Sequence, residues 1–325
     1  MLFKYAQMRG VKKMNSIHFK NKQYCRVAEL MKSSHIFNGD TGGGIFKGKA
    51  YPFILKNCQN NLYTPVKDDV LDYFKDNHIA WWNGRLTNHT LSSQIACLNH
   101  FFPIRDNKEA VLAVIKRILP DIVDIMKIPT DKYMPAYIQF EAVSDTDHLN
   151  ELTSTRGSNC TSVDALIYGV HKDGRKILFP IEWKYVELYN SDNKARGDKG
   201  VTRKKRYTEL INTSAQLRSE NHDIYYFEPF YQLMRQTLWA EQMVAHRKTE
   251  TIQADDYLHI HVIPPENNEL LHKLYTCSGK GMEETWRGMI KDQGKYMIVS
   301  PESLLSPIEP VQFRSLQDYL KIRYW

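Results

Sequence analysis

Residues 161–187 constrain the fold more than any other stretch, because their pattern predicts a β-hairpin. Two runs rich in β-branched and aromatic residues, 163–170 and 176–185, flank a polar tip that contains Asp173 and Gly174. The Asp-Gly pair is one that hairpin turns favour. We therefore expect two antiparallel strands joined by a short turn at this position.

The expected pairing places two carboxylates opposite each other. With the turn centred on Asp173, residue 170 faces 176 and, further from the turn, Asp164 faces Glu182. Like charges at such positions lie roughly 4.5–5.5 Å apart at Cβ and destabilise the pair. Lys184 falls on the same face as Glu182, because side chains alternate along a strand.

A metal ion would resolve this conflict. Mg²⁺ is bound by one or two carboxylates together with waters and substrate phosphate oxygens. We therefore expect Asp164 and Glu182 to hold a divalent ion, and Lys184 to orient the attacking water or to offset charge on a phosphate. The alternative is an exposed hairpin in which Lys184 forms an ordinary surface salt bridge, which contributes little stability.

The order of these residues resembles a known nuclease pattern. Asp164 followed by Glu182-Trp183-Lys184 on the next strand resembles the signature of the PD-(D/E)xK nuclease superfamily, with Val163 where proline is usual. Further motifs between about residues 90 and 235 resemble those of a restriction-endonuclease-like group: Ser92-Ser93-Gln94, Asn99-His100-Phe101-Phe102-Pro103, Phe140-Glu141, Thr161-Ser162-Val163-Asp164-Ala165, Glu182-Trp183-Lys184-Tyr185 and Tyr231-Gln232-Leu233. The resemblance implies a restriction-endonuclease-like α/β fold, a three-layer α/β/α core around a central mixed β-sheet.

The resemblance also implies an activity. It suggests a Mg²⁺-dependent endonuclease that hydrolyses phosphodiester bonds of double-stranded DNA, of the type II-like restriction kind, leaving a 5′-phosphate. Mg²⁺, with Mn²⁺ as a substitute, would be held by Asp164, Glu182 and the backbone carbonyl of Trp183. A DNA repair or processing nuclease and a catalytically inactive DNA-binding protein with the same fold stay open. A homodimer and a companion DNA methyltransferase are further partners to be considered.

Other side chains are candidates for the same site. Glu141 lies on an expected strand before the hairpin and is a candidate third catalytic carboxylate, the alternative being a solvated strand residue. Candidate DNA contacts are Arg156 just before the hairpin, the basic run Arg203, Lys204, Lys205 and Arg206, and Gln232 and Arg235 one turn apart on an expected helix. Each could instead be an ordinary solvated or packing side chain.

Periodicity outlines the rest of the chain. Expected helices are 24–34, 68–77, 91–102, 106–118, 231–246, 282–291 and 315–323, and expected strands are 136–143, 257–263 and 296–299. Asp106 with Glu109 resembles a capping box. Residues 43–50 nearly match a phosphate-binding loop, but Ala50 replaces the Ser or Thr, so we expect a turn. Helices before and after the hairpin favour a layered α/β/α arrangement, here divided into an N-terminal region, 1–89, and a nuclease domain, 90–325.

Composition limits the compartment and the partner. At 325 residues the chain can bury a large core, and its modest net charge of +7 suits a polyanionic partner if the positive side chains are clustered. The five cysteines include no C-x-x-C pair, so we expect free thiols. No apolar run approaches the ~18 residues that a membrane span needs, and the first residues lack the apolar region of a signal peptide. These features predict a cytoplasmic protein without a membrane partner.

Overall fold

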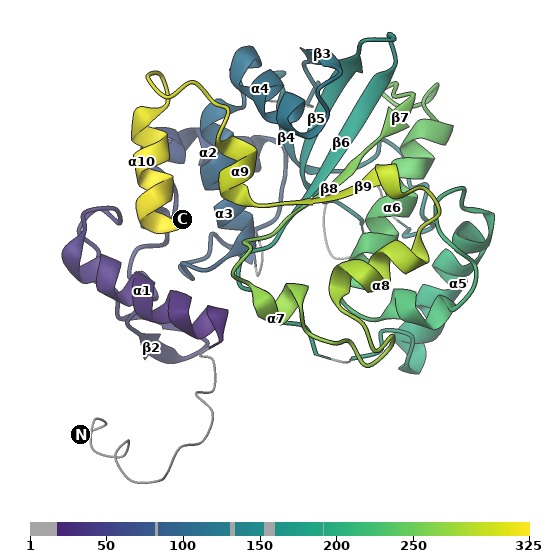
Figure 1. Cartoon of the computed structure of the whole chain (residues 1–325). Coiled ribbons are helices and arrows are strands. Elements are labelled where there is room, and N and C mark those ends of the chain that lie inside the picture. The colour runs from purple at the N-terminus through teal and green to yellow at the C-terminus, as the bar shows by residue number, and fades with distance from the viewer. Residues whose placement is uncertain (1–17, 82–83, 131–133, 153–159, 191) are drawn as a thin grey trace.

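A mixed sheet forms the centre of the molecule in the computed structural model, which describes residues 18–81, 84–130, 134–152, 160–190 and 192–325 (Figure 1). Within these residues seven strands form this sheet: β3 (Ile122–Met126), β4 (Ile138–Ala142), β5 (Val163–His171), β6 (Lys176–Trp183), β7 (Asp256–Tyr257), β8 (His259–Val262) and β9 (Tyr296–Val299). The order is β3-β5-β6-β8-β9, with β4 also pairing β5 and β7 also pairing β6. The expected α/β fold with a central mixed sheet is confirmed.

The sheet changes from antiparallel to parallel at β6. Strand β5 runs antiparallel to β3, β4 and β6, whereas β6, β8 and β9 run parallel to one another. The β5–β6 hairpin has the predicted register, with Val170 opposite Lys176 and Ala165 opposite Ile181. Gly174 at its tip has a φ of 87°, a left-handed conformation that glycine adopts without strain.

Helices cover both faces of the sheet because each face is apolar (Figure 1). On one face, Ala165, Ile167 and Phe179 pack in a core with α1 (Phe19–Ser33), α2 (Lys67–Asp76), α3 (Ser93–Phe101), α4 (Lys108–Ile118), α9 (Pro301–Leu305) and α10 (Arg314–Arg323). On the other face, Leu166 and Leu178 pack with α5 (Gly197–Thr213), α6 (Phe230–Ala245), α7 (Asn268–Leu271) and α8 (Met282–Met289). Strand alternation thus separates two hydrophobic cores.

Some local predictions were wrong. The N-cap of α4 is Asn107, whose side chain accepts a hydrogen bond from the Ala110 N–H at 2.9 Å, so the expected capping box at Asp106 does not form. The basic run lies within α5, and neither this helix nor strand β3 has a counterpart among the predicted elements. The turn expected within 43–50 is present, at Lys47 and Gly48 between β1 (Gly44–Phe46) and β2 (Lys49–Tyr51).

The part of the chain before residue 90 packs against the last helix. Phe19, Val27 and Met31 of α1 share a core with Tyr319 and Leu320 of α10. The division into regions 1–89 and 90–325 stays a prediction. The five cysteines are free thiols, as expected. Among the described residues, no helix combines the length and the apolar character that crossing a membrane requires.

Candidate active site

The predicted site residues lie at one end of the β5–β6 hairpin. Asp164 is the second residue of β5, Glu182 is near the end of β6, and Lys184 directly follows that strand. The β5–β6 ladder ends at the pair Ala165–Ile181, and Asp164 and Glu182 are the next residues beyond it on the two strands. On the other side of β5, Phe140 of β4 pairs with Ala165 and Ala142 pairs with Val163. Glu141 lies between these two pairs, level with Asp164. The registers therefore place these carboxylates on three adjacent strands.

Glu182 is held from two directions. Its side chain is 3% exposed, and its Oε1 accepts a hydrogen bond from Lys184 Nζ at 2.5 Å. Its Oε2 accepts a hydrogen bond from Gln236 Nε2 on α6. Lys184 Nζ donates a second hydrogen bond to Gln232 Oε1, at 2.6 Å. Because Gln232 and Gln236 lie one turn apart, a single face of α6 positions both Glu182 and Lys184.

Lys184 is a buried cation. Burial alone lowers the pKa of its ammonium group, but the negative charge of Glu182, followed by Tyr189 and Glu187, raises it further, and the resulting pKa lies well above the usual value. Lys184 therefore keeps its charge at neutral pH. With Nζ bonded to both Glu182 and Gln232, this charge has a fixed position beside the carboxylates.

The surroundings of Asp164, unlike those of Lys184, disfavour the charged form of the side chain. Its carboxylate accepts a hydrogen bond at 2.7 Å from the backbone N–H of Trp183, and within the described part of the chain it has no salt-bridge partner. Burial raises the pKa of Asp164, the Glu182 and Glu141 carboxylates raise it further, and the result lies well above the usual value. A buried carboxylate surrounded by other carboxylates is a favourable position for a cation.

Glu141 is positioned by unusual backbone geometry. Its φ is 49°, in the left-handed region, which costs a residue other than glycine of the order of 1–3 kcal/mol. Its side chain accepts hydrogen bonds from Gln94 Nε2 at 2.6 Å and from Ser162 Oγ at 3.1 Å. Gln94, Glu141 and Asp164 line one small hollow beside α3. Gln94 belongs to one of the motifs noted in the sequence, but its contact with Glu141 depends on the tertiary fold and no local pattern predicts it.

Two histidines lie behind Glu182 and stay neutral. His261 is its register partner on β8, and His259 Nε2 lies 3.1 Å from Gln236 Oε1. Burial lowers the pKa of His259 to about 3, and burial together with the charge of Lys184 lowers that of His261 well below its usual value. Sequence reasoning missed Gln236, which links Glu182 to His259, although its i+4 spacing from Gln232 on an expected helix was a usable signal.

The donor set suits a hard divalent cation. Asp164, Glu182 and the Trp183 carbonyl offer oxygen atoms, which Mg²⁺ prefers, and the like-charge environment of Asp164 fits a bound cation. Among the described residues, no group of three or more His, Cys, Asp and Glu side chains is arranged to hold a metal. A metal ion held by the two predicted carboxylates would therefore need water and substrate oxygens to complete its coordination.

Two of the expected DNA contacts meet at one ring, because the guanidinium groups of Arg203 and Arg235 lie 5.6 and 5.5 Å from the centre of the Tyr231 ring. Arg235 forms a salt bridge with the buried Glu151 at 2.9 Å, and Arg203 donates a hydrogen bond to the Lys194 carbonyl at 2.9 Å. On α5, the side chains of Lys204 and Lys205 are exposed and that of Arg206 is partly exposed. Gln232 accepts a hydrogen bond from Lys184. Arg156 lies outside the described residues. Their role toward DNA stays a prediction.

Comparison with known proteins gave one positive result. A family model described as restriction endonuclease associating with ARP (REase-ARP) matches residues 18–325. Searches among curated proteins and among solved structures found no match. Because the matched segment contains the sheet, both helical layers and every candidate site residue, the chain belongs to the REase-ARP family of restriction endonucleases.

Proposed function

We propose that this protein is a Mg²⁺-dependent endonuclease that hydrolyses phosphodiester bonds of double-stranded DNA, of the restriction type. The observation that carries the proposal is the environment of Asp164. It is a buried carboxylate beside Glu182 and Glu141, without a salt-bridge partner among the described residues. The charge of Lys184, which is hydrogen-bonded to Glu182 and Gln232, lowers the pKa of Asp164, but burial and the two carboxylates outweigh it. Membership of a restriction endonuclease family supports the reaction class.

Asp164, Glu182 and the Trp183 carbonyl would hold the metal, with Mn²⁺ as a substitute for Mg²⁺. A divalent ion at such a site supplies Lewis-acid stabilisation of phosphate charge and lowers the pKa of a bound water. Lys184 would orient the attacking water and stabilise the negative charge that develops on the phosphate. Its raised pKa supports this role, because the ammonium group stays charged at neutral pH.

The surrounding residues would position this machinery. Gln232 holds Lys184, and Gln236 holds Glu182, both from α6. Glu141 would add negative charge on the far side of Asp164, where Gln94 fixes it. Lys204 and Lys205 would meet DNA phosphates, since both side chains are exposed. The family description also leads us to infer that this chain associates with ARP.

The test is cleavage of supercoiled plasmid DNA by the full chain with Mg²⁺, with Mn²⁺ and in EDTA. We expect cutting with either metal, none in EDTA, and none by Asp164→Asn or Lys184→Met. Asp72→Asn is the matched control, because Asp72 is exposed on α2, and it should cut like the parent. Robust cleavage in excess EDTA, or by Asp164→Asn, would contradict the proposal.

The same assay separates the alternatives that the sequence leaves open. Discrete fragments of fixed length indicate restriction, whereas progressive shortening from DNA ends indicates a processing nuclease. Retarded migration of DNA without metal-dependent cutting indicates a DNA-binding protein that has lost catalysis. The last outcome leaves the fold assignment intact and removes the catalytic roles of Asp164 and Lys184.

A further inference from the structure

A short, exposed β-ribbon lies in the N-terminal part of the fold (Figure 1). Its strands β1 and β2 are joined by a two-residue turn, Lys47-Gly48, with φ angles of 49° and 79°. A turn with positive φ at both central residues favours Asn or Asp before Gly, so a lysine at the first position is strained. The side chains of Lys47, Lys49 and Ala50 are exposed. Strain at an exposed tip is more typical of a binding function than of packing.

The positive charge of the chain is concentrated in its first 60 residues. They contain eleven lysines and arginines but only two acidic residues, Glu29 and Asp40, which gives a net charge of +9. Because the whole chain carries +7, the remaining 265 residues carry −2. Seven of the eleven basic residues lie in the part of the chain that the structure describes. A polyanion is therefore attracted to this segment more than to the rest of the chain.

Five aromatic rings form the base of the ribbon. Tyr24 of α1 stacks on Phe53 with 3.9 Å between ring centroids, and Tyr51 lies 5.2 Å from Phe53. His89 lies 4.9 Å from Phe46 and 5.8 Å from Phe53. A two-stranded hairpin alone is at best marginally stable in water. The rings therefore hold the ribbon in a defined position against α1, so that its turn presents a preformed surface.

Lysines from two elements converge beside these rings. Lys20 Nζ of α1 lies 5.8 Å from the centre of the Tyr24 ring, and Lys47 Nζ lies 5.7 Å from that of Phe46. Burial, together with the charges of Lys20 and Lys47, lowers the pKa of His89 to about 4. His89 is therefore neutral at physiological pH, and the positive charge of this surface comes from its lysines.

The charges of these lysines are not balanced by carboxylates. Within the described part of the chain, Lys20, Lys47 and Lys49 form no salt bridge, although all three are exposed. Exposed lysines elsewhere do, since Lys172 and Lys280 lie 2.8 and 3.0 Å from carboxylate oxygens. Exposed ammonium groups without acidic partners, next to a fixed ribbon, are complementary to the phosphates of a nucleic acid.

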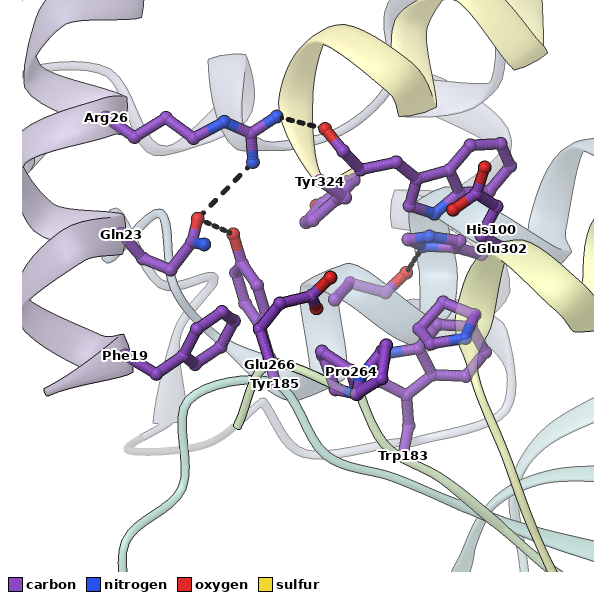
Figure 2. Close-up of a pocket in the computed structure, with 14 residues that line it drawn as sticks. Phe19, Gln23, Arg26, His100, Trp183, Tyr185, Pro264, Glu266, Glu302 and Tyr324 are labelled. Atoms are coloured by element: carbon purple, nitrogen blue, oxygen red, sulfur yellow. Dashed lines mark hydrogen bonds between the residues drawn. The ribbon is translucent and has the colours of Figure 1, made fainter. Parts of the chain in front are cut away.

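Helix α1 connects this surface to the candidate active site. The Tyr185 hydroxyl donates a hydrogen bond to Gln23 Oε1 at 3.0 Å (Figure 2). Tyr185 directly follows Lys184 in the chain, and Gln23 lies less than one helical turn from Lys20. The lysine of α1 is therefore held on an element that packs against the active-site strand.

His89 provides a second connection. It lies five residues before Gln94, which binds Glu141 in the site. Five residues span at most ~18 Å even when fully extended, which is about the length of five base pairs of duplex DNA. One duplex can therefore contact both the active site and the ribbon. Figure 1 shows α1 and β2 on one side of the molecule and the basic helix α5 on the other.

We propose that the β1–β2 ribbon and the start of α1 form a further DNA-binding surface, on which Lys20, Lys47 and Lys49 bind the phosphates of a duplex that is cut at Asp164. In naming duplex DNA, the inference rests on the proposed function. It assigns to the N-terminal part of the chain a role that the catalytic residues do not have, because phosphate contacts add affinity for DNA of any sequence.

The test is binding of a fluorescently labelled duplex by the full chain in EDTA, measured by anisotropy between about 50 and 200 mM salt. The variant with Lys20, Lys47 and Lys49 replaced by alanine should bind at least roughly 10-fold more weakly at the lowest salt concentration. The slope of log affinity against log salt concentration should become shallower by up to ~2.7, which is ~0.9 for each phosphate contact.

Two further variants separate contact from net charge and from folding. Replacing Lys116 and Arg117 of α4 and Lys321 of α10 by alanine removes the same charge from exposed positions elsewhere, and the slope should stay that of the parent. Lys47→Asn places at the turn a residue that adopts the left-handed conformation more easily. It should melt no lower than the parent, yet its slope should be shallower by up to ~0.9.

Three results would overturn the inference: a parent that does not bind the duplex, equal slopes in the ribbon and control triple variants, or a Lys47→Asn variant that binds DNA like the parent. Unchanged DNA binding would leave these lysines for an acidic protein partner or for solvent. Failure of the proposed function has a different signature. A parent that binds DNA through these lysines but never cuts it with Mg²⁺ contradicts the nuclease and leaves this surface in place.

Discussion

Asp164 is a carboxylate that the fold places among like charges, and this makes the metal hypothesis testable by stability alone. The Asp164→Asn variant removes one buried charge while it keeps shape. In EDTA it should melt at the same temperature as the parent or higher, because the repulsion by Glu182 and Glu141 is relieved. Mg²⁺ should raise the melting temperature of the parent and not of the variant, since only a ligand of the folded state stabilises it. A less stable variant in EDTA, together with a parent that ignores Mg²⁺, would contradict the assignment.

The raised pKa of Asp164 gives a second prediction at the same residue. A carboxyl group whose pKa is higher in the folded protein than its usual 3.8 favours folding while it is protonated. That contribution is complete below the unfolded-state pKa and is lost as the pH rises through the folded-state pKa. The melting temperature measured in EDTA should therefore decrease more steeply with rising pH for the parent than for Asp164→Asn, starting above about pH 4. Parallel pH profiles for the two proteins would show that Asp164 is not electrostatically strained.

At the scale of elements, the hairpin was predictable and its neighbours were less so. The alternation in β5 and β6 and the Asp-Gly turn determine the register locally, so Asp164 and Glu182 could be aligned from sequence. Helix α5 was not predicted because most of its residues are polar or basic, and only a few apolar positions, such as Tyr207 and Ile211 one turn apart, indicate a buried face. Contacts such as Gln94 with Glu141 join segments far apart in the chain, and no local pattern encodes them.

The basic surface of α5 carries its own prediction. Replacing Lys204, Lys205 and Arg206 by alanine should weaken binding to every DNA sequence and should flatten the salt dependence by up to ~0.9 for each phosphate that the variant no longer binds. The measurement is the slope of log affinity against log salt concentration. Replacing Lys116 and Arg117 of α4 and Lys321 of α10, exposed residues, removes the same charge elsewhere and is the matched control. Equal slopes in the two triple variants would show that only net charge matters.

At the scale of the whole molecule, the first and last thirds of the chain are joined by polar contacts, of which those of Arg323 are buried. Arg323 of α10 is 1% exposed and donates hydrogen bonds to the Asn61 carbonyl at 2.7 Å and to Asn61 Oδ1 at 2.5 Å. Arg26 of α1 donates to carbonyl oxygens at the end of α10. These contacts cross the predicted boundary between regions 1–89 and 90–325, so they couple the stability of the two regions.

The Arg323→Met variant tests that coupling. It keeps a long apolar stem but removes the donor to the buried Asn61 Oδ1, which costs about 1–3 kcal/mol, while the Asn61 carbonyl still accepts from Asn99 Nδ2 at 3.0 Å. If the two regions unfold together, urea denaturation should show one transition in the parent and one transition at lower urea in the variant. Two transitions, of which only one shifts, would instead support regions that unfold separately. Lys321→Met, at an exposed position of the same helix, is the control and should leave the midpoint unchanged, because its side chain extends into solvent.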